Sequence, residues 1–464
     1  MTALVDDFEE LRTKVNGAVI TGRDPGYDEA RTVWNAATDR RPAAVVRCAS
    51  AADVVAALAF ARARDLEIAV RGGAHSTGGA SMLDDGLVID LSAMNSVAVD
   101  PQARRARVGG GALLADLDAA TQQHGLAVPA GLISHTGVGG LTLGGGMGWL
   151  TRKFGMSIDN LVSAEVVLAD GRVVRTSADS EPDLFWALRG AGTNFGVVTE
   201  FEFTLHEVAP MVHLGLYFWP LESGPQMLRR MRDVVPGLSP ELNVVFGAVN
   251  APPAPFVPPE HHFRPGYVAV LVSFAGPEVH SEAASELTAD LPPLFEMATP
   301  IPYVALQQLL DEANHWGVYA WEKGAIFEDL TDGAIEAVTE QIEQKVSPMS
   351  VTLFYRLDGA FCATRDEDTS FGGRRVPQFA CFIIGMAPDA DGLARERDWA
   401  RATWSALQPF VLSNSAYVNG QSDFDDARVR EVYGDKYPRL AELKARYDPE
   451  DVFHRTANIR PALA

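Results

Sequence analysis

Apolar and polar residues follow two alternating periods along residues 43–203, and this alternation predicts a succession of short strands and helices. A helix is expected to begin after Ser50, whose spacing to Asp53 fits a capping box. A second, amphipathic helix over 112–124 ends at Gly125. Strands are expected at 44–47, 66–70, 86–91, 162–168, 173–176 and 196–205, and a short helix opens at Pro182.

The pattern changes after about residue 208, where glycine becomes sparser and aromatic residues more frequent. The proline-dense segment 251–260 predicts a loop or an extended segment. Strands are expected at 267–274 and 350–357, and helices at 303–313, 332–345 and 427–446. Together the two patterns predict an α+β fold with one domain over 1–207, a second over 208–410 and a C-terminal segment over 411–464.

Charge and cysteine content exclude several classes of protein. The chain has 464 residues, with 39 Lys plus Arg against 61 Asp plus Glu, so its formal net charge is -22. A surface this negative repels phosphate backbones and anionic lipids, and no run of basic residues opposes it, so we expect neither nucleic-acid nor membrane partners. The N-terminus lacks a signal-peptide pattern, and Cys48, Cys362 and Cys381 form no disulfide or zinc motif, so we expect a cytoplasmic protein.

Glycine clusters are the strongest local signal in the chain. They flank His75, occur consecutively at 109–111, and recur through 131–148. Such clusters permit close approach of the backbone to a ligand, and successive backbone N–H groups form a concavity that binds anions. They therefore favour a cofactor that carries a diphosphate, although tight turns alone remain an alternative. Neither a dinucleotide-binding G-x-G-x-x-G after a strand nor a P-loop is present, so neither of the common phosphate loops holds it.

His75 follows a predicted strand directly and lies among glycines, which leave its side chain sterically open. A neutral imidazole in such a loop is suited to act as a nucleophile, a base or a ligand, but a lone histidine is also often structural. The other histidines show no metal-ligand spacing, and no G-x-S-x-G motif supports a serine hydrolase, so we expect no metal site.

Several motifs, taken together, resemble one known family. They are Arg71 to Ser76 (RGGAHS), Ser134 to Trp149 (SHTGVGGLTLGGGMGW), Ser157 to Leu161 (SIDNL), Gly192 to Val198 (GTNFGVV), Tyr417 to Asn419 (YVN), and Asn458 with Ile459. The chain resembles the FAD-linked oxidases of the vanillyl-alcohol oxidase superfamily, in the branch of proteins similar to berberine bridge enzyme. The resemblance implies a two-domain fold of the PCMH type, in which residues 1–207 and 411–464 bind FAD and an α+β domain over 208–410 binds substrate.

The same resemblance implies that His75 holds FAD covalently, through the 8α-methyl group of the flavin ring. A second attachment, through a cysteine in some relatives, is not expected because Ile133 stands at that position. The residues implied to bind the cofactor are Arg71, Gly72, Gly73, Ala74, His75, Ser76, Gly79, Ser134, His135, Thr136, Gly139, Gly140, Gly145, Gly148, Trp149, Asn160, Gly196, Val197, Val198, Tyr417, Asn419 and Asn458.

The resemblance also indicates three candidate catalytic residues. Thr136 corresponds to a position near the reactive edge of the flavin, where many relatives have valine, and packing is its alternative role. Tyr355 shares a strand face with Val351 and Leu353 that is implied to face the flavin, although it also fits a core position. Tyr417 is implied to contact flavin or substrate. The tyrosine that many relatives place three residues later is Gly420 here, which leaves the catalytic base open.

The function implied is that of an oxidase, which moves hydride from a small organic substrate to flavin N5 and then reduces oxygen to hydrogen peroxide. Thr136 keeps open an oxygenase of secondary metabolism that uses a flavin–oxygen adduct of the N5-oxide type, and Gly420 keeps open a non-catalytic FAD-binding protein. The aromatic segment 314–321 fits either a pocket wall or a core strand. The partners expected are a small-molecule substrate and molecular oxygen.

Overall fold

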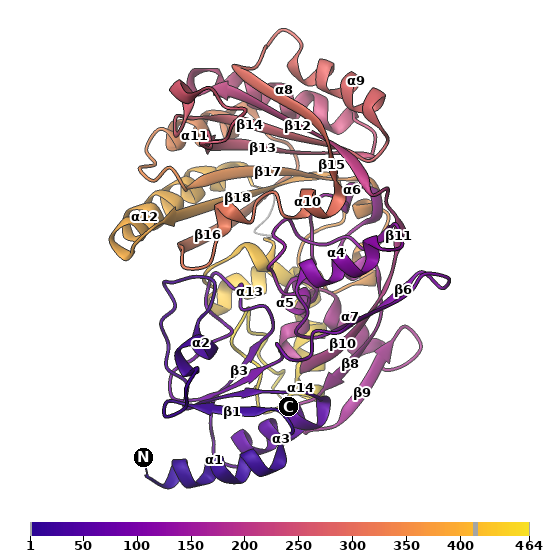
Figure 1. Cartoon of the computed structure of the whole chain (residues 1–464), viewed down its shortest axis with the longest axis vertical. Coiled ribbons are helices and arrows are strands. Elements are labelled where there is room, and N and C mark those ends of the chain that lie inside the picture. The colour runs from indigo at the N-terminus through magenta and orange to yellow at the C-terminus, as the bar shows by residue number, and fades with distance from the viewer. Residues whose placement is uncertain (1, 412–415, 464) are drawn as a thin grey trace.

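The fold was analysed in a computed structural model, which describes residues 2–411 and 416–463 (Figure 1). Helices and strands are mixed throughout, so the expected α+β class is confirmed. Three small sheets lie in one half of the molecule, and one large sheet lies in the other. The chain builds the first half, then the second, and its C-terminal helices α13 (Asp426–Tyr433) and α14 (Tyr437–Tyr447) return to the first.

The first half contains a four-stranded, a five-stranded and a two-stranded sheet. The four-stranded sheet has the order β1 (Ala18–Thr21), β2 (Ala44–Arg47), β4 (Leu87–Asp90) and β3 (Ile68–Arg71), with β4 parallel to both β2 and β3. The antiparallel five-stranded sheet has the order β5 (Val97–Asp100), β6 (Arg105–Gly109), β10 (Val197–Thr204), β8 (Leu161–Val167) and β9 (Val173–Ser177). The third pairs β7 (Leu126–Ala127) with β11 (His206–Glu207).

Seven helices accompany these sheets. They are α1 (Thr2–Lys14), α2 (Tyr27–Arg31), α3 (Ala51–Arg62), α4 (Leu114–Gln122), α5 (Val138–Gly144), α6 (Thr151–Phe154) and α7 (Pro182–Ala191). The Ser50 side chain caps α3 as expected, but the Asp53 carboxylate does not complete a capping box. It accepts hydrogen bonds from the backbone N–H groups of Asn16, Gly17 and Ala49 at 2.9, 3.0 and 2.8 Å, and so ties the start of β1 to α3.

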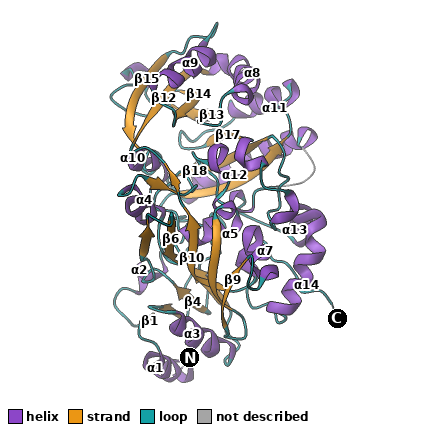
Figure 2. Ribbon diagram, turned by 90° about the vertical axis from the view of Figure 1, so that its right-hand side faces the viewer, coloured by secondary structure: helices purple, strands orange, loops and turns teal. Residues whose placement is uncertain are grey.

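The second half is built on an antiparallel sheet of seven strands (Figure 2). Its order is β15 (Phe295–Pro302), β12 (Met211–Pro220), β14 (Pro265–Ser273), β13 (Leu242–Asn250), β17 (Val351–Leu357), β18 (Gln378–Ala387) and β16 (Tyr319–Phe327). Helices α8 (Gly224–Val234), α9 (Pro277–Thr288), α11 (Asp332–Ile342) and α12 (Ala390–Leu407) share a core with one face of this sheet. The opposite face contacts the first half, where Val245 and Val270 pack with Trp149 and Leu150.

Two expected helices differ from the structure. The helix expected over 427–446 is divided into α13 and α14 at Gly434, whose φ of 48° cannot continue an α-helix. The helix expected over 303–313 ends early, because α10 spans only Tyr303–Gln307. Beyond it, the Asp311 carboxylate accepts hydrogen bonds from the backbone N–H and hydroxyl of Ser134, so this segment follows the other half of the molecule instead of a helical path.

Two buried ion pairs join the halves. Arg152, in α6, donates to the Asp358 carboxylate at 2.6 Å and to the carbonyls of Leu242 and Leu238 at 2.9 and 2.8 Å. Arg375 donates through both terminal nitrogens to the carboxylate of Asp159, at 3.0 and 2.8 Å. Because both pairs are almost fully shielded from water, they contribute only if every partner is present. No helix in the described part of the chain has the length and apolar content needed to cross a membrane.

We predict that Arg152→Met destabilises the protein by about 3–5 kcal/mol, because it leaves a buried carboxylate without its main partner. Urea unfolding followed by tryptophan fluorescence measures the change. The matched control is Arg365→Met, which removes an exposed arginine paired with Asp368 and should leave the unfolding midpoint unchanged. Equal midpoints for the two variants would show that the Arg152 pair does not hold the halves together.

Candidate active site

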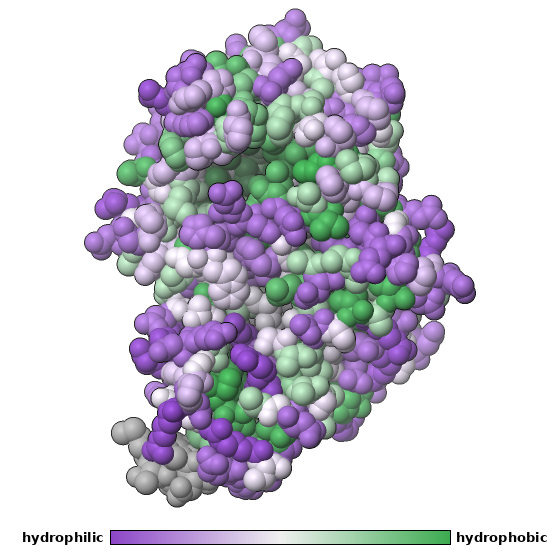
Figure 3. All heavy atoms as spheres, in the orientation of Figure 1, coloured by the Kyte–Doolittle hydropathy of each residue, from purple (hydrophilic) through white to green (hydrophobic). Residues whose placement is uncertain are grey.

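A large cavity of about 1210 Å³ lies between the two halves. Its walls are glycine-rich loops of the first half and the face of the seven-stranded sheet that is turned toward the first half. Figure 3 shows hydrophobic residues gathered in a hollow on the upper half of this face of the molecule. Pockets for a single small ligand typically measure ~300–1,000 Å³, so this cavity has room for a cofactor and a substrate together.

The glycine loops meet at backbone-contact distance. A Cβ atom on Gly73 would lie 2.3 Å from the backbone nitrogen of Gly137, and a Cβ on Gly137 would lie 2.3 Å from the nitrogen of Gly73. A Cβ on Gly139 would lie 3.0 Å from the carbonyl oxygen of Gly110, whereas Gly140 has open space beside it. The loops therefore need glycine in order to close on one another, and they present bare backbone to the cavity.

His75 lines this cavity and stacks between two aromatic rings. Its imidazole lies 4.5 Å from the Trp34 ring at an interplanar angle of 16°, and 5.0 Å from the His135 ring. Burial, reinforced by His135, lowers the pKa of His75 to about 3, so the ring is neutral at physiological pH. Its Nε2 atom is buried without a hydrogen-bond partner. The site thus holds a neutral imidazole whose Nε2 atom is not engaged by the protein, which suits a role toward a bound group.

The structure brings most of the expected cofactor residues to the cavity wall. These residues are Gly72, Gly73, Ala74, His75, Ser76, Thr136, Gly139, Gly140, Trp149, Gly196, Val197, Val198, Tyr417 and Asn419. Eight others do not line it: Arg71, Gly79, Ser134, His135, Gly145, Gly148, Asn160 and Asn458.

Four of the five polar residues among these eight form hydrogen bonds within the protein. Arg71 donates to the Thr32 carbonyl at 2.5 Å, and Ser134 is bound by Asp311. Asn160 donates to the carbonyls of Phe154 and Met156 at 2.9 and 2.8 Å, and Asn458 donates to the Asp451 carboxylate at 3.0 Å. The buried ring nitrogens of His135 have no hydrogen-bond partner, and its ring lies 5.0 Å from that of His75. Their side chains therefore shape the loops and do not face the cavity.

The three glycines that lie outside the wall serve close packing. A Cβ atom on Gly79 would lie 2.3 Å from the Thr38 hydroxyl oxygen, and one on Gly148 would lie 2.0 Å from the Ala130 carbonyl oxygen. At Gly145 the colliding atom is the methyl carbon of Met156, at 2.4 Å. These glycines let neighbouring segments approach without contacting a ligand.

The three candidate catalytic residues all line the cavity. Tyr355 shares its strand face with Val351 and Leu353, which line the cavity too, and burial raises the pKa of its phenol far above neutral pH. The Tyr417 oxygen accepts hydrogen bonds from the Gly146 N–H and the Asn419 amide, each at 3.0 Å, while burial raises its pKa to about 12. Both phenols therefore stay protonated at neutral pH and are weak bases there.

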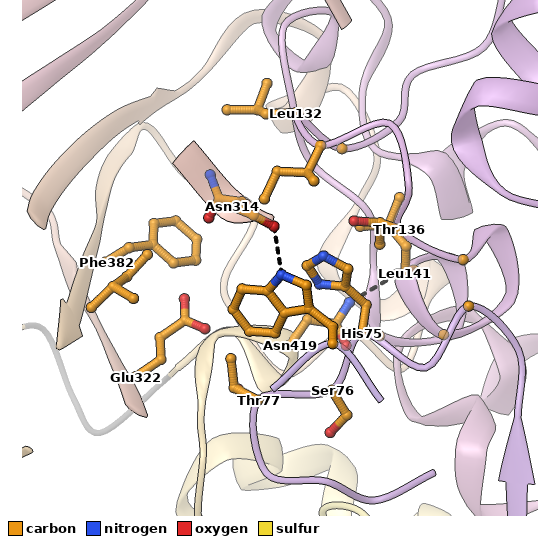
Figure 4. Close-up of a pocket in the computed structure, with 18 of the residues that line it drawn as sticks. His75, Ser76, Thr77, Leu132, Thr136, Leu141, Asn314, Glu322, Phe382 and Asn419 are labelled. Atoms are coloured by element: carbon orange, nitrogen blue, oxygen red, sulfur yellow. Dashed lines mark hydrogen bonds between the residues drawn. The ribbon is translucent and has the colours of Figure 1, made fainter. Parts of the chain in front are cut away.

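Two cavity residues were not expected from the sequence. Trp34 stacks on His75 from a segment far away along the chain, and its indole N–H donates to the Asn314 carbonyl at 2.6 Å. Glu322, in β16, is 8% exposed and points into the cavity beside Phe382 (Figure 4). Burial raises the pKa of its carboxyl group to about 8. No local motif marks either residue, because each reaches the site only through tertiary folding.

The aromatic segment 314–321 divides between its two expected roles. Asn314 and His315 line the cavity, while Trp321 packs in the core shared with the covering helices. Within residues 2–411 and 416–463, no three His, Cys, Asp or Glu side chains are grouped so that they could hold a metal ion.

Comparisons with known proteins agree with this geometry. A family model described as "FAD binding domain" matches residues 42–177, and one described as "Berberine and berberine like" matches residues 416–460. (R)-6-hydroxynicotine oxidase from Paenarthrobacter nicotinovorans is 31% identical over 460 residues, which cover 96% of this chain and 97% of that protein.

Solved structures show the same fold. The structure of 6-hydroxy-D-nicotine oxidase from Arthrobacter nicotinovorans matches with a TM-score of 0.84 and 27% identity, covering 97% of this chain and 98% of that one. Glucooligosaccharide oxidase from Acremonium strictum, described with a 6-S-cysteinyl, 8α-N1-histidyl FAD, matches with a TM-score of 0.85 and 21% identity, covering 99% and 100%. The chain therefore belongs to the berberine-bridge-enzyme-like family of FAD-linked oxidoreductases.

Proposed function

We propose that this enzyme is an oxidase that removes hydride from a C–H bond beside a hydroxyl or amine group of a small organic substrate. The observation that carries the proposal is that His75 and the glycine loops share one cavity with the apolar face of the seven-stranded sheet. We call this sheet face the substrate wall. When bound, FAD supplies the hydride acceptor at its N5 atom and passes the electrons to oxygen, which yields hydrogen peroxide. The chain itself supplies positioning and a water-poor environment.

The residues present fit a covalent attachment of FAD through His75. The imidazole is neutral, which an attacking nitrogen requires, and its Nε2 atom has no partner within the protein. Stacking on Trp34 fixes the plane of the ring. One solved relative of the same fold carries a histidyl-linked FAD, which supports the same chemistry here.

Attachment through one residue is the form that the cavity supports. Ile133, which the family resemblance implies stands at the position of the second, cysteinyl link, lines the cavity. Cys48, Cys362 and Cys381 are free thiols, and none of them is among the described cavity residues. Burial raises the pKa of all three, which disfavours the thiolate needed for such a bond.

The substrate wall favours an apolar substrate over a sugar. The sheet face toward the cavity presents mostly aliphatic side chains, among them Leu216, Val245, Val270, Leu353, Ile384 and Met386. A sugar would lose hydrogen bonds to water on this surface without replacement, at a cost of about 1–3 kcal/mol for each unpaired group. An aromatic or aliphatic alcohol or amine would gain from burial instead.

Thr136 supports a second candidate function. Its side chain lines the cavity, and its hydroxyl has no hydrogen-bond partner among the described residues, so it does not cap the backbone. A free hydroxyl at this position is available to a bound oxygen species. The alternative activity is an oxygenase that transfers an oxygen atom to its product.

We predict that denatured protein keeps its yellow colour and that its intact mass exceeds that of the chain by one FAD. His75→Ala should still fold, because the glycine loops remain, but should release all of its flavin on acid precipitation. The matched control is His135→Ala, which removes the neighbouring imidazole and should retain the bound mass. If acid strips flavin from the wild type, or if His135→Ala loses the link while His75→Ala keeps it, the assignment to His75 is wrong.

We predict that apolar aromatic alcohols or amines reduce the enzyme-bound flavin anaerobically and release peroxide in air, whereas oligosaccharides do neither. Leu353→Asn should lower kcat/KM for an apolar substrate by about 10-fold or more, since one lost apolar contact can discriminate by this much. Flavin spectra and a coupled peroxide assay measure both effects. Faster turnover of oligosaccharides than of apolar compounds would contradict the substrate class, and failure of every compound to reduce the flavin would favour a non-catalytic FAD-binding protein.

We predict that Thr136→Val leaves FAD content and anaerobic reduction unchanged but alters the rate of reoxidation by oxygen, because only the hydroxyl is lost. Stopped-flow absorbance measures both half-reactions. Incorporation of ¹⁸O from labelled oxygen into the product distinguishes the two functions: an oxidase leaves the label in peroxide, and an oxygenase transfers it to the product. Identical reoxidation of variant and wild type would assign Thr136 to packing.

A further inference from the structure

We propose that Glu322 is the catalytic base of this site and accepts the proton of the substrate hydroxyl or amine group as hydride departs. This inference rests on the proposed oxidase function. It identifies a proton acceptor at a site where the sequence indicated only Tyr355 and Tyr417 as ionisable catalytic candidates. Glu322 was not among the residues that sequence motifs indicate, and its role follows from its position in the folded protein.

The position of Glu322 on the edge strand β16 sends its side chain into the cavity. Its neighbour Trp321 packs toward the covering helices, so the alternation of the strand turns Glu322 to the opposite face. Figure 4 shows Glu322 and Phe382 projecting from the second half toward the loop that carries His75 and Thr77. Two other carboxylates border the cavity, but Glu312 and Asp423 are exposed, so Glu322 is the buried acid among the described cavity residues.

No cation compensates this buried carboxyl group. Lys323, next in sequence, forms an ion pair with Asp423, and no lysine, arginine or histidine among the described residues pairs with Glu322. An unpaired buried acid costs stability, so a purely structural site would not favour it. Its presence on a wall that is otherwise mostly apolar indicates a role toward the ligand.

The space beside Gly420 is filled by the side chains of Glu322 and Phe382. A Cβ atom on Gly420 would lie 3.6 Å from Oε1 of Glu322 and 2.8 Å from the Phe382 ring. A larger side chain at 420 would therefore collide with Phe382 and contact the carboxyl group. Glu322 and Phe382 together occupy the volume into which a side chain at position 420 would extend. The carboxyl group of Glu322 therefore lies where the tyrosine of many relatives would place its side chain.

The groups that face Glu322 leave it as the strongest base available. Tyr355 approaches from β17 and Tyr417 from the C-terminal segment, and burial raises the pKa of both phenols far above neutral pH. Thr77, from the His75 loop, is uncharged, and its hydroxyl lowers the pKa of Glu322, which burial raises. His75 itself is neutral. Burial leaves Glu322 with a pKa of about 8, close to neutral pH, where a general base is most effective.

The reaction balances with this assignment. The C–H bond breaks and its electron pair leaves with the hydrogen as hydride to FAD, while the O–H or N–H bond breaks and its proton moves to a carboxylate oxygen of Glu322. The carbon–oxygen or carbon–nitrogen double bond forms as both depart. The substrate loses two electrons and the flavin gains them, and Glu322 returns its proton to solvent before the next turnover.

The test compares anaerobic flavin reduction in three variants with the wild type, using a substrate found in the panel described above. Glu322→Gln should slow reduction by about 100-fold or more, since it removes a positioned proton acceptor and keeps the shape. Glu322→Asp should restore part of the rate. Tyr355→Phe should change the rate far less, because its phenol is protonated in the active form.

The pH profile separates a catalytic role from a structural one. The wild-type reduction rate should rise as pH increases through about 8, the pKa of Glu322, because the carboxylate is the active form, and Glu322→Gln should lose this rise. The wild type should also lose stability as pH rises from about 4.5 to about 8, because the unfolded carboxyl group ionises first. Glu322→Gln should therefore have a Tm at pH 8 equal to or above that of the wild type, with its FAD content unchanged.

The outcomes distinguish this inference from the proposed function. If no substrate reduces the wild-type flavin, the oxidase function fails. If the wild type is reduced and Glu322→Gln is reduced equally fast with the same pH profile, Glu322 is not the base. If Glu322→Gln loses its FAD or has a lower Tm at pH 8, and Glu322→Asp keeps the wild-type rate and profile, Glu322 is structural and the proposal is overturned.

Discussion

Two buried ion pairs join the halves of this enzyme, and the shape of the cavity depends on the distance at which the halves are held. Arg152 with Asp358 and Arg375 with Asp159 each join an element of the first half to a segment of the second half. A change of about 1 Å in this spacing would move the substrate wall relative to the flavin, and near-attack geometry tolerates little such movement. The two ion pairs orient the halves more specifically than the apolar contact between them, because hydrogen bonds between charged groups are directional and apolar contacts are not.

Burial has one common effect on the polar groups of the cavity. It lowers the pKa of His75 and raises those of Glu322, Tyr355 and Tyr417, so each group shifts toward its uncharged form. The cavity therefore holds few charges before substrate binds, and any charge that develops during reaction is weakly screened. The apolar surroundings of the cavity thus also set the acid–base behaviour of the groups that line it.

The sequence predicted those parts of the site that local patterns encode. The glycine clusters and the strand before His75 depend on a few consecutive residues, and the two-residue period of β17 placed Tyr355 with Val351 and Leu353 on one face. Trp34 and Glu322 could not be found in this way, since their neighbours in the site lie far away along the chain. The helix division at Gly434 was missed because apolar periodicity continues on both sides of it. A motif also does not show which way a side chain points, and the Asn160 amide donates to the carbonyls of Phe154 and Met156.

The return of the C-terminal segment has a consequence for biosynthesis. Val429, Tyr433 and Leu440 complete the core that surrounds strands β6, β8 and β10, so the cofactor half cannot finish folding when its N-terminal part leaves the ribosome. Roughly 220 residues separate the two parts, which at typical rates of synthesis corresponds to a delay of about 10–40 s. During that interval the nascent chain exposes apolar surface that a chaperone can bind. The cavity itself is complete only after translation, because Tyr417 and Asn419 of the same segment form part of its wall.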